Sequence, residues 1–328
     1  MQKIVVIGAS VVDVILKSDK FSIIKSHQME TGVALCEVLG GKTDAQEGVV
    51  STGGGGSNVA VGFRRLGESV KLISKIGKDE FGRIIQDDLG REMVDSSLLK
   101  VGDGVTGFSS VLVAENGSRS IVTFRGESAK FDLVDIDFRT LEMADWVQIS
   151  SLGGNIDLLD DVVNFCYQKG IRVGVNPGIG EISDKKKLIS IVKKVDLLCL
   201  NRQEAALLGG IDFNEEREIA NFISNVGVKF VVVSDGKRGA SVIRNQLWLK
   251  MDAYKNKSVD DTGAGDAFVV GVVDGYINNK DIDDCLEMGI ANGSSVVSFM
   301  GAKKGLLRKA EVLVNKRKKL KVVEERLS

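Results

Sequence analysis

The stretch SVDDTGAGDAF, residues 258–268, decides the fold. Its three small residues, Gly263 to Gly265, let backbone N–H groups approach a ligand without interference from a Cβ atom. The apolar run that follows predicts a buried helix, and its N-terminus carries the partial positive charge that suits a phosphate. Asp266 would repel an anion unless it lies to one side as a general base, although an acid here can also simply complement the helix dipole. The segment therefore predicts a site for phosphoryl transfer.

The composition limits the classes of protein to consider. The chain has 328 residues, 43% of them apolar, and a formal net charge of −1, enough for one large α/β domain or two ordinary ones. It lacks a global basic field and a run of 18 apolar residues, so we expect neither a nucleic-acid partner nor a membrane partner. Four cysteines without C-x-x-C spacing predict a reduced, cytoplasmic protein. Because there is a single histidine, a base must come from Asp, Glu or Lys.

The order of apolar segments predicts the architecture. Residues 3–7 read as a strand buried on both faces, and from Trp146 onward strand and helix patterns alternate. This alternation predicts an α/β fold in one domain, 1–328, with a doubly wound, mostly parallel sheet and helices on both faces. Two insertions, approximately 12–52 and 104–127, read as short strands and are assigned to a small β-sheet lid. The Asn116-Gly117 pair marks a hairpin in the second.

Four motifs carry a resemblance to a known family. Residues 260–268 closely resemble the C-terminal signature of the ribokinase-like (PfkB) carbohydrate kinases, D-[ST]-T-G-A-G-D-x-F, from which only Asp261 departs. The glycine turn and helix start at 53–60 are similar to the family's G-G-x-x-x-N-x-A. The N-x-x-E at 201–204 and the [ST]-x-G-x-x-G loop at 234–239 follow in the family's order. The resemblance spans nearly the whole chain and implies the ribokinase-like fold.

The resemblance also implies roles for the residues of the reaction centre. Asp266 would deprotonate the substrate hydroxyl, and the amides of Gly263, Ala264 and Gly265 would form an anion hole. The sugar-binding residues it implies are Asp13, Gly54 and Asn58. Taken without the resemblance, Asp13 also fits a satisfied structural acid, and the glycines at 53–56 fit a flexible loop before a helix cap.

Nucleotide and metal roles follow from the same resemblance. The ATP-binding residues it implies are Ser234, Gly236, Gly239 and Asn292. Glu204 and Asn201 would support Mg²⁺ and phosphate through water, although N-x-x-E also fits a capping box at a helix start. Asp260 matches a residue of a monovalent-cation site, so K⁺ joins ATP and Mg²⁺ among the expected cofactors.

Together these features predict ATP-dependent phosphorylation of a hydroxymethyl group on a sugar or sugar-like molecule. A nucleoside kinase of the same fold is the nearest alternative, with Phe21, Phe108, Phe124 and Phe131 as candidates to contact a base. A non-catalytic sugar-binding sensor is a third interpretation. We expect a homodimer through the lid, because exposed strand edges are usually covered. The basic segment 303–321 is predicted to be the solvated face of a helix.

Overall fold

One large sheet organises the chain, which the computed structural model describes over residues 1–25, 33–256, 258–315 and 320–327. Its strand order is β16-β15-β14-β13-β12-β11-β10-β1-β6-β7. The strands from β7 to β13 pair in parallel, whereas β14, β15 and β16 add on antiparallel. The strands are β1 Lys3–Ile7, β6 Ser69–Gly77, β7 Leu99–Gly102, β10 Trp146–Ser150, β11 Val173–Asn176, β12 Leu197–Asn201, β13 Val231–Ser234, β14 Ala240–Arg244, β15 Leu247–Met251 and β16 Val322–Arg326.

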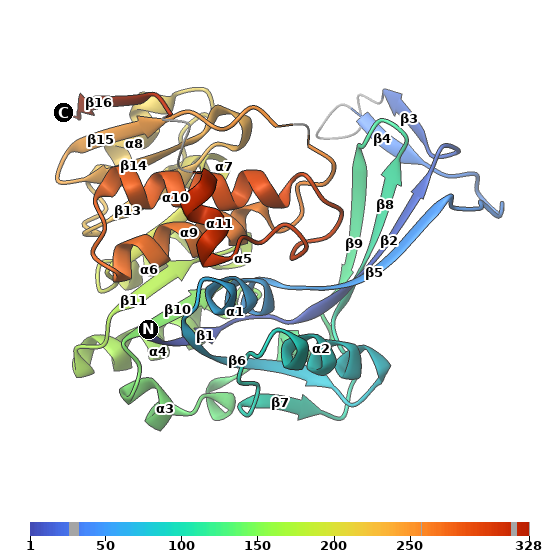
Figure 1. Ribbon diagram of the computed structural model, residues 1–328, viewed down its shortest axis with the longest axis horizontal. Helices are drawn as coiled ribbons and strands as arrows, with labels where there is room; N and C mark the ends of the chain where they lie inside the picture. Colours follow the sequence, from blue (N-terminus) through green and yellow to red (C-terminus); the bar gives the residue numbers. More distant parts are fainter. Residues whose placement is uncertain (26–32, 257, 316–319, 328) are drawn as a thin grey trace.

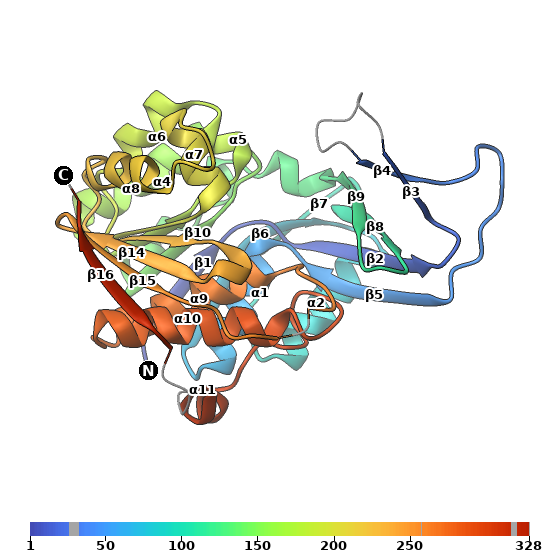
Figure 2. The same cartoon turned by 90° about the horizontal axis from the view of Figure 1, so that it is seen from above.

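Helices cover both faces of this sheet, as Figure 2 shows edge-on. On one face lie α1 Gly55–Arg65, α2 Glu80–Arg91, α9 Ala264–Ile277, α10 Ile282–Val296 and α11 Lys309–Asn315. On the other lie α3 Phe138–Glu142, α4 Ile156–Lys169, α5 Ile179–Ile182, α6 Lys185–Val192, α7 Arg202–Gly209 and α8 Glu216–Ser224. Short 3₁₀ turns occupy Gly126–Lys130, Leu133–Asp135 and Gly236–Arg238. The two buried clusters confirm the predicted doubly wound α/β fold.

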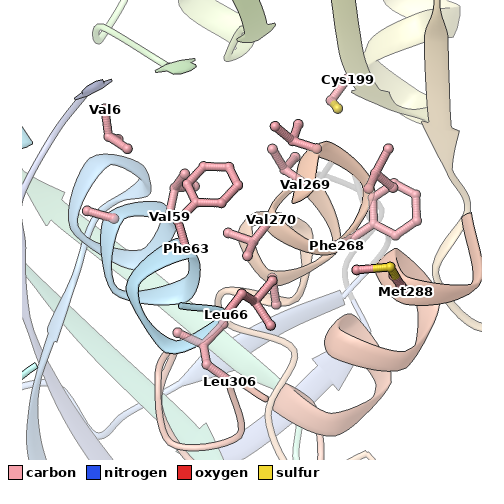
Figure 3. Packing of buried hydrophobic residues seen from close by; sticks show 14 of the residues in the cluster. Val6, Val59, Phe63, Leu66, Cys199, Phe268, Val269, Val270, Met288 and Leu306 are labelled. Carbon is pink, nitrogen blue, oxygen red and sulfur yellow. The ribbon is translucent and has the colours of Figure 1, made fainter. Parts of the chain in front are cut away.

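The first face is held together by very close helix packing. Figure 3 shows Phe63 of α1, Val270 of α9 and Met288 of α10 within one continuous apolar cluster. A Cβ added at Gly62 would lie 2.7 Å from a Val270 methyl, and one at Gly271 would lie 2.4 Å from the Met288 carbonyl oxygen. Glycine at these positions therefore lets α9 approach both of its neighbouring helices.

A second, smaller sheet projects from the edge of the molecule, on the right of Figure 1. Its order is β5-β2-β8-β9, from β2 Val11–Ser18, β5 Glu47–Gly53, β8 Phe108–Ala114 and β9 Arg119–Phe124. A two-stranded ribbon of β3 Ser22–Lys25 and β4 Val33–Cys36 extends it. These strands fall within the two predicted insertions apart from Val11 and Gly53, and residues 26–32 lie outside the described residues.

The structure departs from the sequence expectations mainly near the C-terminus. The segment 303–321 is not one solvated helix: α11 starts at Lys309, and the chain joins the large sheet again as β16. Lys303 is buried and donates to Thr52 Oγ1 at 2.7 Å and to Asp88 Oδ2 at 2.8 Å. The basic pattern of residues 303–321 was misleading because it cannot reveal that Asp88, 215 residues from Lys303 in the sequence, pairs with that lysine.

The close contact between α9 and α10 generates a stability prediction. Gly271→Ala should lower the free energy of unfolding by about 1–3 kcal/mol, because the new methyl collides with the Met288 backbone. Gly90→Ala is the matched control, since this glycine lies in α2 with nothing within 4 Å of an added Cβ. It should raise the free energy of unfolding by at most about 1 kcal/mol, because alanine favours a helix more than glycine does. Urea titrations of both variants give the measurement. Equal effects would show that the contact at Gly271 is not tight.

Candidate active site

Polar residues end successive parallel strands of the large sheet. Ser150 ends β10, Asn176 ends β11, Asn201 ends β12 and Ser234 ends β13. Carboxyl ends of parallel strands share one edge of a sheet, which is where ligands bind in open α/β folds. A cavity of about 210 Å³ at this edge is lined in part by Asn176, Glu204, Gly263, Gly265 and Asp266. The signature residues at 263–266 and 204 therefore meet at one cleft.

The turn before α9 lines this cleft with Gly263 and Gly265. The Ala264 amide within the turn donates to the Asp261 carbonyl at 3.3 Å. Gly263 caps the helix in the left-handed conformation, φ 75°, which L residues with a side chain rarely adopt. The Gly263 backbone packs closely against Ala302, and an added Cβ at Gly263 would lie 2.5 Å from the Ala302 methyl. At Gly265 nothing lies within 4 Å of an added Cβ, so this residue faces open space. Because the first N–H groups of a helix have no intrahelical acceptor, the turn is suited to bind an anion.

Asp266 lies in the first turn of α9 and is held by the other glycine-led helix. Its Oδ2 accepts a hydrogen bond of 2.8 Å from Nδ2 of Asn58 in α1. Burial raises the pKa of Asp266 above its ordinary value, while the Asn58 hydrogen bond and the charge of Lys303 oppose that rise. A carboxylate with a raised pKa beside an anion-binding turn is suited to accept a proton.

The expected substrate side of the cleft is built on β2 and the 53–54 turn. Burial raises the pKa of Asp13 above its ordinary value. A hydrogen bond with Ser109 opposes this rise, and the negative charge of Asp260 increases it. An added Cβ at Gly53 would lie 2.1 Å from Asp13 Oδ2, so only glycine leaves room for this carboxylate. Gly54 begins α1 with φ 90°, and an added Cβ there would lie 2.5 Å from the Ala9 carbonyl oxygen.

Several buried polar atoms around this turn have no hydrogen-bond partner among the described residues. They are the hydroxyls of Ser10, Ser51 and Ser150 and the carbonyl oxygen of the Asn58 side chain. Ser150 lies next to the turn, because an added Cβ at Gly55 would be 3.0 Å from its Cβ. Leaving such groups without partners is costly unless a ligand or water satisfies them. Sequence motifs pointed to Asn58 but gave no signal for the three serines.

Glu204 and Asn201 form the capping box that the structural interpretation predicted. Asn201 Oδ1 accepts from the Glu204 amide and Glu204 Oε2 accepts from the Asn201 amide, each at 2.8 Å. Burial is the main cause that raises the pKa of Glu204 to about 7. The charges of Asp266 and Glu181 act in the same direction, and the hydrogen bonds from Asn201 oppose the rise. The cap therefore fixes a carboxylate in the cleft whose negative charge is destabilised until a cation binds nearby.

A second cavity of about 300 Å³ adjoins the other side of the α9 turn. Ser234, Gly236, Gly239, Ala264 and Gly265 all contribute to its lining. The structure thus brings the three predicted nucleotide-loop residues to the anion-binding turn. Its remaining wall is largely apolar and includes Phe268, Ile290 and Val297, as a flat heterocycle would require.

Asn292 does not line this cavity, contrary to the expectation from the resemblance. Its side chain is buried, donates to the Ala267 carbonyl at 2.7 Å and accepts from the Leu307 amide at 2.9 Å. It thereby ties α10 to α9 and to the segment before α11. The next two residues, Gly293 and Ser294, line the cavity instead.

Asp260 is surrounded by donors from the chain itself. Its Oδ1 accepts from the amide and hydroxyl of Thr262 at 2.9 and 2.6 Å and from Arg119 at 2.8 Å. Its Oδ2 accepts from the Gly301 amide at 2.9 Å. Burial works in the opposite direction, but these hydrogen bonds and the Arg119 charge hold the pKa of Asp260 below its ordinary value. A monovalent cation beside Asp260 stays a prediction.

The chain's identity follows from its likeness to known proteins. The profile of the pfkB family of carbohydrate kinases matches residues 1–309. The chain belongs to the PfkB family. A ribokinase from Haemophilus influenzae is 25% identical over 272 residues, 80% of this chain and 87% of that protein. The solved ribokinase from Thermotoga maritima superposes with a TM-score of 0.80 at 22% identity, covering 97% of this chain and 100% of the other.

This PfkB kinase is therefore an ATP-dependent phosphotransferase with an alcohol group as acceptor. An adenosine kinase from Sinorhizobium meliloti shares its fold, with a TM-score of 0.78 at 19% identity over 96% of this chain and 99% of that one. Fold likeness alone does not decide between a sugar and a nucleoside as the substrate. Within the described part of the chain, no helix has both the length and the hydropathy needed to cross a bilayer.

Proposed function

We propose that this kinase phosphorylates a hydroxymethyl group of a sugar or a sugar-like, polyhydroxylated molecule, with Asp266 as the general base. The observation that carries the proposal is the Asp266 carboxylate, which accepts a hydrogen bond from Asn58 and lines the cleft together with Gly263 and Gly265 of the anion-binding turn. Buried polar atoms behind this side of the site have no partner among the described residues and support a polar, hydroxyl-bearing ligand; they lie on Ser10, Ser51, Asn58 and Ser150. Asp13 and Gly54 complete the proposed sugar site.

The position of the lid aromatics supports a sugar over a nucleoside. Phe108 and Phe124 are cross-strand partners on the face of the lid sheet opposite to Asp13, because side chains alternate along β2 and β8. Phe108 also contacts Phe81 of α2, with 5.5 Å between ring centroids. These rings pack on the outer side of the lid and are not placed to stack on a base in the cleft. Phe131 is buried.

In the proposed reaction the chain's own groups bind, orient and move one proton. Asp266 takes the proton from the attacking hydroxyl, and the amides of Gly263, Ala264 and Gly265 stabilise the charge on the transferring phosphoryl group. ATP occupies the cavity of Ser234, Gly236 and Gly239. Mg²⁺ would neutralise phosphate charge. Glu204, with Asn201 positioning it, offers the oxygen chemistry that Mg²⁺ prefers.

The metal site fits an ion held largely by water and phosphate. Among the described residues no group of three or more acidic, His or Cys side chains converges to bind a metal. Mg²⁺ commonly uses one or two carboxylates, several waters and the phosphates of its substrate. A single carboxylate with its pKa raised to about 7 agrees with that mode. K⁺ near Asp260 remains a proposal from the family resemblance.

Replacing the base should abolish turnover and leave binding intact. Asp266→Asn keeps the shape of the side chain, so kcat should fall about 10²- to 10⁴-fold while affinities for ATP and sugar change little. Asp274→Asn is the matched control, because Asp274 lies in the same helix and its pKa, raised to about 7, makes the neutral amide a close substitute. Kinetics and calorimetry on an active sugar provide the measurement. A parental kcat in Asp266→Asn would remove the proposed mechanism.

The Mg²⁺ requirement should depend on pH through Glu204. Its pKa is raised to about 7, so a proton competes with the metal below that pH. The Mg²⁺ concentration for half-maximal rate should rise up to about tenfold from pH 7 to pH 6 and little change is expected between pH 8 and 9. Glu204→Gln should need more Mg²⁺ at every pH and show a flatter profile. ATP protonation affects both proteins alike, so a parallel pair of profiles would contradict the role of Glu204.

We also propose a homodimer formed through the lid. Val50, Val122 and Phe124 lie on the outer face of the lid sheet with 56%, 68% and 50% of their surfaces exposed. Such clustered apolar surface is usually covered by a partner, and β5 and β9 are open strand edges. A second copy of the same sheet would cover both.

Light scattering should therefore give twice the 35.3 kDa of one chain at micromolar concentration. Val122→Lys should shift the mass toward the monomer, because a charge would be buried at the interface. Met143→Lys is the control, since Met143 is similarly exposed at 63% but follows α3, away from the lid. A parent that is monomeric at these concentrations would end the proposal.

A further inference from the structure

An ion pair joins the tip of the lid to the loop that leads into α9. Nη1 of Arg119 lies 2.8 Å from Oδ1 of Asp260, across 141 residues of sequence. The side chains are only 29% and 9% exposed, respectively. Such shielding from solvent distinguishes this pair from an ordinary surface salt bridge, which contributes little.

Asp260 acts as an internal brace for the anion-binding turn. Three of its hydrogen bonds go to Thr262 and Gly301, the residues that precede Gly263 and Ala302. Gly263 and Ala302 in turn pack against each other at backbone distance. The position of the Asp260 carboxylate therefore fixes both sides of the turn that lines the cleft.

Arg119 is attached to the turn of the β8–β9 hairpin (Figure 1). It is the first residue of β9, directly after a tight turn in which the Ser118 carbonyl accepts from the Ala114 amide at 2.8 Å. Arg119 can reach Asp260 only while this hairpin lies over the α9 loop. The contact is thus a property of the lid's position, whereas the bonds to Thr262 and Gly301 are local.

The guanidinium also balances a concentration of negative charge. Asp260 and Asp13 are close enough for their charges to repel, and Asp266 and Asp13 interact in the same way. Lys303 acts on Asp13 and Asp266 through its charge without contacting them. Arg119, by contrast, contacts Asp260 directly. A phosphate approaching the turn meets a less negative surface when the hairpin is in place.

We propose that Arg119 is a positioning residue that couples closure of the lid to the order of the anion-binding turn. This inference rests on the proposed kinase mechanism, because the turn is taken to hold the transferring phosphoryl group. The free protein can make the contact between Arg119 and Asp260, as the structure shows, and a sugar that holds the lid closed raises the fraction of molecules in which the turn is braced when ATP binds. Sugar binding should therefore raise the affinity for the nucleotide, and nucleotide binding should raise the affinity for the sugar by the same factor.

The first test compares Arg119→Met with Arg119→Lys and the parent. Arg119→Met should lower kcat about 10- to 100-fold, the effect of slightly misplacing a catalytic loop, with ATP affinity in the absence of sugar within about twofold of the parent. Arg119→Lys should recover much of the loss. Arg83→Met, which removes an exposed arginine paired with Glu80 at 2.7 Å and 72% exposed, should match the parent. An unchanged kcat in Arg119→Met overturns the proposal.

The second test uses a rescue that a merely structural role would not permit. Millimolar guanidinium ion should restore kcat of Arg119→Ala severalfold, and tetramethylammonium at equal ionic strength should not, because only the former fits and donates to a carboxylate. In calorimetry the parent should bind a non-hydrolysable ATP analogue more tightly with sugar present, and Arg119→Met should lose that gain. Equal coupling in both proteins counts against the proposal.

A third measurement needs no substrate and so separates this inference from the proposed function. Hydrogen–deuterium exchange of the apo protein should be faster at Val259 to Thr262 in Arg119→Met than in the parent, with α4 unchanged. If the parent phosphorylates no sugar but this difference is present, the proposed function fails and the brace stands. If exchange at Val259 to Thr262 is identical in Arg119→Met and the parent while the parent is an active sugar kinase, the role of Arg119 is contradicted and the proposed function is not.

Discussion

The close packing of glycine-containing helices is the constraint on which the site depends. Gly54 and Gly263, which cap α1 and α9, both have positive φ. The two N-termini lie next to each other, since an added Cβ at Gly55 would be 3.5 Å from Asp266 Oδ1. Gly62 lies against Val270, and an added Cβ at Gly56 would lie 2.5 Å from the Gly8 carbonyl. This approach brings Asn58 within 2.8 Å of Asp266 although 208 residues separate them. A helix shifted outward by one methyl group would separate the proposed base from its hydrogen-bond donor.

Electrostatics at the cleft follow from that geometry. Asp13, Glu204 and Asp266 have raised pKa values because burial and mutual repulsion disfavour their charged forms. Asp260 differs, since its hydrogen bonds and Arg119 hold its pKa low. Lys303 is the buried counter-charge, and burial lowers its pKa while Asp88 opposes that change. The free protein therefore holds an excess of negative potential that a divalent cation would relieve on entering with the nucleotide.

The sequence was sufficient for the fold class and for the motifs that meet at the cleft, because each motif, such as Gly263 before its helix, is a local pattern. It could not place contacts between distant segments, such as Arg119 with Asp260. The antiparallel strand β16 was not anticipated for the same reason, since it pairs with β15, far earlier in the chain. β14 and β15 were missed although they form a local hairpin around Asn245 and Gln246. Asn292 shows the same limit within one helix. Its motif position placed it beside the cavity that Gly293 and Ser294 line. One residue of helix turns a side chain by about 100°, which is enough to bury Asn292 against α9 instead.

Substrate selection can be argued from what the cleft leaves unsatisfied. A pocket that is only apolar discriminates weakly against an added or missing group, whereas a pocket with buried, unpaired polar atoms rejects a ligand that cannot pair with them. The hydroxyls of Ser10, Ser51 and Ser150 and the Asn58 carbonyl are such atoms among the described residues. A deoxy analogue would leave at least one of them desolvated and unbonded, at a cost of about 1–3 kcal/mol each. For the proposed sugar substrate, the pattern of hydroxyl groups is therefore a property by which this site would select its ligand.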